Sequence, residues 1–223
     1  IVSDNLVAWW DFGSKYGRLP SDSHVVFDKS GYNNHLGVGA SYETLATTEV
    51  PGAIDAEKVY RFDSLPNPKL CKSPISNLEF TGDFTVSVWF YRTNGSNREV
   101  IVKRDTNSGP EFGTFTIYAN GNMYMGDTTS AEGHHQLTTP IRSNEWTFLT
   151  LVIDGMAMKS YINGQLSKST ILTERIVSSS ELQVASQGNI GYLDDVKIYK
   201  KALTSAEIQG EFEKSYRHEL LTA

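Results

Sequence analysis

Cysteine, long apolar runs and positive charge are all scarce in this sequence of 223 residues. Its one cysteine, Cys71, excludes an internal disulfide and a cysteine-rich zinc module. No apolar run approaches the roughly 18 residues of a membrane-spanning helix, so we expect no membrane insertion. Twenty basic residues against 26 acidic ones give a formal net charge of −6. This balance argues against nucleic acid as a partner and leaves room for a bound cation.

The first residues, Ile1-Val2-Ser3-Asp4, lack the charged and apolar regions of a secretory signal. We therefore expect either that a signal peptide has been removed or that the sequence is a module of a longer chain.

Residues that favour strands and turns are plentiful, with 11 Tyr, 10 Phe, 4 Trp and 18 Gly. Aromatic side chains favour strands and glycine favours turns, so this composition predicts an all-β sandwich. Apolar and polar residues alternate over short windows bounded by Gly, Asn, Asp and Ser. The windows predict strands over 84–92, 99–103, 146–154, 159–162 and 189–199.

The strand predicted over 84–92 carries large side chains on both faces. Alternation places Phe84 and Phe90 on one face and Trp89 and Tyr91 on the other. The second face is therefore not a typical solvated face.

A β-hairpin is predicted over 115–126, with Asn120-Gly121 as its two-residue turn, because both residues tolerate a positive φ. That turn places Tyr118 opposite Met123 and on the same face. A turn of three residues would exchange the two faces.

The hydrophobic period becomes helical only near the end of the chain. Thr204 and Glu207 fit a capping box, and Ile208, Phe212 and Tyr216 recur at four-residue spacing. We expect a helix over about 204–217 that lies across an edge or end of the sandwich. The proline-rich segment 64–74 is predicted to be a loop, and residues 1–223 are predicted to form a single domain.

Several segments, in this order, resemble the LamG-like jelly-roll domains of the concanavalin A-like lectin/glucanase superfamily. The resemblance implies a two-sheet antiparallel β-sandwich with jelly-roll topology, a short C-terminal helix and an extracellular, secreted or cell-surface location. The segments are LVAWWDF at 6–12, DKSGYNNH at 28–35, FTVSVWF at 84–90, YING at 161–164 and GYLDDVKIY at 191–199.

The same resemblance implies a structural Ca²⁺ site. Asp28 and Asp194 would be carboxylate ligands, Asp195 an adjacent candidate, and Gly31 to Asn34 would supply carbonyl oxygens. Calcium takes six to eight oxygen ligands, and an all-oxygen set does not favour zinc. The alternative is that Asp28 forms an Asx-turn with its own loop and that the aspartate pair is merely solvated.

No catalytic constellation is recognisable. The paired carboxylates of a retaining glycosidase, about 5 Å apart, have no counterpart in the spacing of the acids, and Cys71 has no identifiable histidine partner. His134 and His135 could not easily chelate one metal ion from a strand, because neighbours point to opposite faces. They are interpreted as loop residues. We therefore expect no enzyme activity.

Sugar binding uses aromatic rings surrounded by a few polar groups. The candidate rings are Trp89, Tyr91 and Tyr118, although Trp89 could instead pack in the core. Trp9, Trp10 and Trp146 are assigned to structure. The candidate polar partners are Arg104, Asp105 and His134.

These patterns predict a non-catalytic carbohydrate-binding, lectin-like module with a structural calcium ion. The alternatives are a protein–protein interaction or adhesion module, or an accessory domain of a larger glycan-active enzyme. The resemblance is compatible with all three, because one fold hosts many functions.

Overall fold

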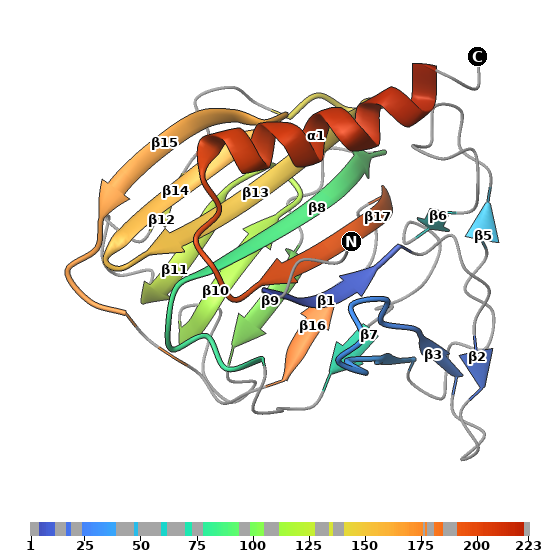
Figure 1. The fold of residues 1–223 in the computed structure, drawn as a ribbon, viewed down its shortest axis with the longest axis horizontal. Coiled ribbons are helices and arrows are strands. Elements are labelled where there is room, and N and C mark those ends of the chain that lie inside the picture. The colour runs from blue at the N-terminus through green and yellow to red at the C-terminus, as the bar shows by residue number, and fades with distance from the viewer. Residues whose placement is uncertain are drawn as a thin grey trace.

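Two antiparallel sheets face each other in the computed structural model, and the described helix, α1 (Ser205–Leu220), lies outside the first of them (Figure 1). No helix in the described part of the chain is long and apolar enough to span a membrane. The structure describes residues 5–11, 17–18, 24–38, 47–48, 59–61, 70–72, 78–93, 99–104, 112–127, 134–135, 141–175, 177, 181–184 and 191–220.

The first sheet holds eight of the described strands, with β8 and β17 near its middle. Two predicted strands, 84–92 and 146–154, have the bounds that alternation indicated. In spatial order the strands are β15 (Gln165–Ile171), β14 (Ala157–Ile162), β13 (Trp146–Asp154), β8 (Phe84–Arg92), β17 (Gly191–Tyr199), β6 (Val59–Arg61) and β5 (Thr47–Thr48), with β1 (Leu6–Trp10) also paired to β17.

The second sheet holds nine of the described strands and packs against the inner face of the first. In spatial order they are β12 (His134–His135), β11 (Met123–Asp127), β10 (Phe112–Tyr118), β9 (Glu99–Arg104), β16 (Leu182–Val184), β7 (Leu70–Lys72), β4 (Leu36–Val38), β3 (His24–Val26) and β2 (Gly17–Arg18).

The main core lies between the sheets. Val86, Phe90 and Leu151 contribute from the first sheet, and Ile101 and Phe115 from the second; all five are buried. Each such side chain contributes about 1.5–3 kcal/mol when it leaves water. The two-sheet antiparallel sandwich expected from alternation is confirmed.

A second, smaller core lies between α1 and the outer face of the first sheet. The predicted capping box is present: the Glu207 amide donates to Thr204 Oγ1 at 3.2 Å, and the Thr204 amide donates to Glu207 Oε2 at 2.8 Å. Phe212 stacks on Trp89 with ring centroids 5.6 Å apart. The helix therefore covers the face of the sheet and not an edge or end, because its apolar stripe meets large side chains on that face.

The predicted hairpin register is wrong by one position. The Tyr118 amide donates to the Asn122 carbonyl at 2.9 Å, so the turn encloses three residues, 119–121, and Ile117 pairs with Met123. This is the three-residue turn that exchanges the two faces. Asn120 Oδ1 accepts from the Asn122 amide at 3.0 Å, which closes this wider turn. Tyr118 therefore shares the outer face with Tyr124 and not with Met123, which lies in the core.

Two short strands lie where loops were expected. β7 pairs with both β4 and β16 inside the segment 64–74, because its three residues fit between flanking prolines. His134 and His135 form β12, which pairs with β11 at the end of the second sheet.

Candidate functional site

The Asp28 carboxylate organises its own loop. Its Oδ1 accepts from the amides of Trp9 at 2.9 Å and Ser30 at 2.8 Å. Its Oδ2 accepts from the Ser30 hydroxyl at 2.7 Å and the Asn34 amide at 2.8 Å. Four donors therefore surround the two oxygens, which is the Asx-turn arrangement and satisfies a buried carboxylate without a cation.

The rest of this loop is tied to β1. Asn34 is buried, its Nδ2 donates to the Val7 carbonyl at 2.6 Å, and its own carbonyl accepts from Trp10 Nε1 at 2.8 Å. Gly31 has a φ of +93°, a conformation that glycine adopts without strain. The Asn34 carbonyl, one of the expected metal ligands, is therefore engaged within the protein.

Asp194 and Asp195 lie at a bulge in β17, and Asp195 has a φ of +48°. Asp194 Oδ1 accepts from the Asp195 amide at 2.7 Å. Asp195 Oδ1 accepts from Trp9 Nε1 at 2.5 Å, and Asp195 Oδ2 contacts the Lys197 ammonium at 2.8 Å. Asp195 is therefore neutralised by a lysine of its own strand.

These residues do not fit a calcium ion as the structure arranges them. The Asp28 oxygens and the Asn34 carbonyl accept protein donors, and the Asp195 carboxylate already holds an ammonium group. Within the described ranges, no group of three or more His, Cys, Asp or Glu side chains is placed to hold a metal ion. Calcium requires six to eight oxygens that face one point.

Trp89 does not present its ring to solvent, which corrects its assignment to the binding face. It is 2% exposed and lies beneath α1, between Phe148 and Phe212. The helix covers this part of the sheet, so the ring contributes to the second core.

Tyr91, two positions further along β8, belongs to a cluster of three aromatic residues. Trp146 on β13 and Tyr192 on β17 are both its direct cross-strand partners. The ring centroids of Tyr91 lie 5.6 Å from those of Trp146 and of Tyr192, with edge-to-face geometry. All three residues are half-buried. We call Tyr91, Trp146 and Tyr192 the aromatic row.

Gly191 allows β17 to approach this row closely. Its φ is +122°, and a Cβ at this position would lie 2.0 Å from the Tyr91 carbonyl oxygen. Any side chain would therefore displace the backbone that carries the central ring.

Polar side chains directly precede Trp146 in the sequence. Arg142 and Glu145 are exposed and form an ion pair with a 3.6 Å separation. The exposed Asn144 donates its amide to the Arg92 carbonyl at 2.7 Å, which ties this turn to the end of β8. Sequence reasoning had assigned Trp146 to structure and had not singled out Tyr192. Only the cross-strand register places both beside Tyr91.

The other predicted ligand residues belong to the second sheet. Tyr118 is half-buried and its ring lies 5.1 Å from that of Tyr124. Arg104 is on β9 and His134 on β12, but their side chains are outside the described residues, as is Asp105. The described residues of the predicted set are therefore divided between the two sheets.

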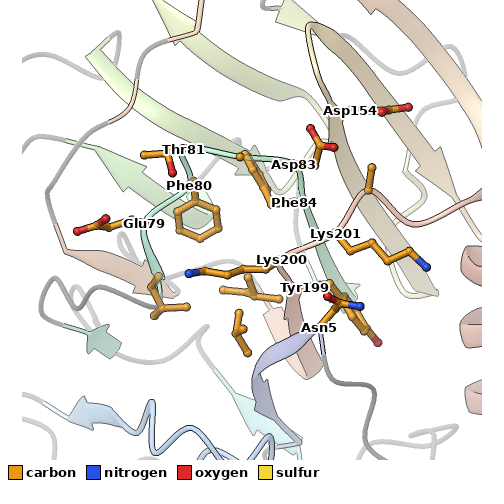
Figure 2. A pocket seen from close by; sticks show the side chains of 15 residues that line it. Asn5, Glu79, Phe80, Thr81, Asp83, Phe84, Asp154, Tyr199, Lys200 and Lys201 are labelled. Carbon is orange, nitrogen blue, oxygen red and sulfur yellow. The ribbon is translucent and has the colours of Figure 1, made fainter.

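A cleft of about 680 Å³ lies at the opposite end of β8, where β13 and β17 end (Figure 2). This volume is within the range of small-molecule sites. Its apolar lining includes Leu78, Phe80 and Ile198, all of which belong to the buried core. The Asp83 carboxylate accepts from the Gly155 amide at 2.7 Å, which ties one wall to the turn after β13.

Most charged groups of the cleft are engaged within the protein. Asp154 contacts Lys159 at 2.8 Å, and Lys201 contacts Glu207 at 2.5 Å. Among the described residues that line the cleft, Lys200 is exposed and its ammonium has no ion-pair partner. In Figure 2 its side chain extends beneath the Phe80 ring, while that of Lys201 points the other way.

A family model described as the concanavalin A-like lectin/glucanases superfamily matches residues 69–209. This match covers more than half of the chain, so the protein belongs to this superfamily. The family match and the two antiparallel sheets confirm both the resemblance and the expected fold class. No curated protein sequence matches the chain at a significant level.

Solved structures with the same fold include binding domains of toxins. The binding domain of Paraclostridial Mosquitocidal Protein 1 matches with a TM-score of 0.69 and 21% identity, covering 96% of this chain and 53% of that one. A structure whose title states that cell entry of botulinum neurotoxin type C depends on interaction with two ganglioside molecules has a TM-score of 0.67 and 18% identity, over 96% and 52% of the two chains.

The binding domain of botulinum neurotoxin DC in complex with rat synaptotagmin II has the same TM-score and identity, 0.67 and 18%, and the same coverage, 96% and 52%. The chain thus spans about half the length of these neighbours. At these identities the likeness establishes the fold. The chain is therefore a concanavalin A-like domain whose fold these toxin domains share.

Proposed function

We propose that this protein is a non-catalytic carbohydrate-binding module and that the aromatic row is its binding surface. The supporting observation is that Tyr91, Trp146 and Tyr192 stand side by side on three neighbouring strands and are half-buried. The C–H faces of a sugar pack on such rings, and the adjacent polar groups fix its orientation.

The row fits binding better than catalysis. None of its three members is a carboxylate, whereas glycosidic bond hydrolysis requires two carboxyl groups on either side of the bond. Arg142, Asn144 and Glu145 directly precede Trp146 and offer donors and acceptors for hydroxyl groups. The rings provide contact area at a low cost in side-chain entropy.

The structural neighbours agree with a binding role, since their titles name toxin binding domains, a ganglioside interaction and a complex with synaptotagmin. We extend this to a secreted or surface-displayed protein. With a single cysteine the chain has no internal disulfide, so the fold in that location would not depend on one.

A glycan array followed by calorimetry with the best ligand tests the proposal. Tyr91→Ala combined with Tyr192→Ala is expected to abolish binding and leave the main core intact. Two matched variants report on the rival surfaces: Tyr118→Ala alters the second sheet, and Lys200→Ala alters the cleft. Both are expected to bind as wild type.

Loss of binding in Lys200→Ala with retention in the row variant would move the site to the cleft and refute the proposal. An array without signal for any glycan would refute carbohydrate binding altogether.

The second candidate is a protein-interaction module. The same row favours it, because Tyr, Trp and Arg are enriched among residues that dominate protein interfaces, and Arg142 is exposed. If the array is silent while a partner protein binds wild type but not the row variant, this candidate replaces the first.

A further inference from the structure

Lys197 lies at the centre of a buried polar cluster. Its side chain is 13% exposed, and its ammonium contacts Asp195 Oδ2 at 2.8 Å and Glu211 Oε2 at 3.1 Å. It also lies 5.1 Å from the centroid of the Trp9 ring. Two carboxylates and one aromatic face therefore surround a single cation, which is a favourable set of partners for an ammonium group.

The partners come from three segments that are far apart in the sequence. Trp9 is on β1, Asp195 is at the bulge of β17, and Glu211 is on α1. Figure 1 shows β1 beside β17, with α1 above the same sheet. Tyr199, also on β17, is buried and interacts with Glu211, and both burial and this carboxylate raise the pKa of its phenol.

The cluster extends to the Asp28 loop through Trp9. The Trp9 amide donates to Asp28 Oδ1, and its indole Nε1 donates to Asp195 Oδ1. Lys29 lies 5.7 Å from the centroid of the same ring. Two of the carboxylates that the family resemblance would give to calcium therefore flank one tryptophan and are satisfied by N–H groups and an ammonium.

A carboxylate buried in this way needs compensation, because removing a charge from water costs several kcal/mol. At Asp28 the compensation comes from four hydrogen bonds, and at Asp195 it comes from Lys197 and Trp9. A divalent cation at either carboxylate would have to displace these donors, and near Asp195 it would face the positive charge of Lys197.

We infer that the Lys197 ammonium replaces a divalent cation at this junction, joining β1, β17 and α1, so that the fold of this module is independent of calcium. The inference is separate from the proposed carbohydrate function, because it concerns stability and is tested without any glycan.

Thermal unfolding of the full chain in excess calcium chloride and in excess EDTA is the first measurement. A ligand that binds the native state must raise the unfolding midpoint by mass action. We expect equal midpoints in the two solutions and no heat of binding when calcium is titrated into the protein. A midpoint that rises with calcium concentration would overturn the inference.

The second measurement is the unfolding midpoint of Lys197→Met. This substitution preserves side-chain length but leaves Asp195 without its cation and Glu211 with only the exposed Lys214, and we expect the midpoint to fall by about 10 °C. Lys214→Met is the matched control, because Lys214 contacts the same Glu211 at 3.3 Å while being 78% exposed. Its midpoint should change little, since exposed pairs contribute little.

Lys197→Arg retains the charge, and we expect its unfolding midpoint to lie between those of wild type and Lys197→Met. It also keeps the inference testable if the methionine variant does not fold. A methionine variant as stable as wild type, or an arginine variant no better than the methionine variant, would refute the role of the ammonium charge.

Discussion

Two parts of the same sheet face differ in what covers them. Trp89 and Tyr91 are two positions apart on β8 and point to the same side of the first sheet. Trp89 is 2% exposed because Phe212 of α1 stacks on it, whereas Tyr91 is half-buried among Trp146 and Tyr192. The same alternation therefore gives a buried ring at one position and a half-buried ring two residues further on.

The two positions differ in burial because of what packs on each ring, since both side chains are large and aromatic. The described ring contacts of Phe212 are with Trp89 and Phe148, which occupy one cross-strand pair of the sheet. The aromatic row consists of the next pair of that ladder on the same face, Tyr91 and Trp146, together with Tyr192 on β17. We therefore expect substitutions in the two parts to separate stability from binding.

The largest expected effect is on stability, from Trp89→Ala. This change removes the ring between Phe148 and Phe212 and should lower the free energy of unfolding by about 3–5 kcal/mol. Denaturant unfolding measures it, with Tyr91→Ala as the matched variant on the same strand. The half-buried Tyr91 should lose less than half as much. Equal losses would show that the two parts of the face are packed alike.

Gly191→Ala should have the next largest effect, because it acts on the backbone beside the aromatic row. The new Cβ would lie 2.0 Å from the Tyr91 carbonyl oxygen, at a φ of +122°. We expect a loss of about 1–3 kcal/mol in stability, together with weaker glycan binding, since the Tyr91 backbone must shift.

Gly82→Ala is the control for this substitution, because a Cβ there meets no atom within 4 Å. It should be close to neutral in both assays. If Gly191→Ala binds as tightly as wild type, the position of Tyr91 does not control binding. That result would contradict the proposed role of the aromatic row.

The part of the structure that sequence predicted well is local. Alternation gave the bounds of β8 and β13, and the capping box gave the start of α1, because neighbouring residues determine these features. The hairpin register was missed because it depends on the length of the turn: the Asn120 side chain closes a three-residue turn, the alternative to the two-residue turn that Asn-Gly favours.

The candidate site depends on pairings between distant segments, and this is why sequence reasoning found only part of it. Tyr91 was identified, but Trp146 and Tyr192 join it only through the register of β13, β8 and β17. Trp89 was misassigned because the position of α1 follows from packing. The Asx-turn at Asp28, the alternative weighed against calcium, matches the observed hydrogen bonds because it is local to one loop.

The smallest expected effect concerns the attachment of α1 and depends on pH. Hydrogen bonds from Lys201 and from the Thr204 amide lower the pKa of Glu207 to about 2. A carboxyl whose pKa is lower in the folded state stabilises the protein above its unfolded pKa of about 4.5. This stabilisation is lost as the pH falls towards 2. Glu207 is exposed, so the effect should be below about 1 kcal/mol.

The measurement is the difference in unfolding midpoint between wild type and Glu207→Gln as a function of pH. It should be present at neutral pH, decrease below about 4.5 and vanish near 2. Glu213→Gln, on the same helix but outside the cap, is the control and should show a smaller difference. Because the described α1 side chain Phe212 stacks on Trp89, whereas the described ring contacts of Tyr91 are with Trp146 and Tyr192, we expect glycan binding to follow neither curve while the protein remains folded. A decrease in glycan binding that follows the loss of the Glu207 cap would show that α1 also stabilises the aromatic row. The Trp89 region and the aromatic row would then be one structural unit.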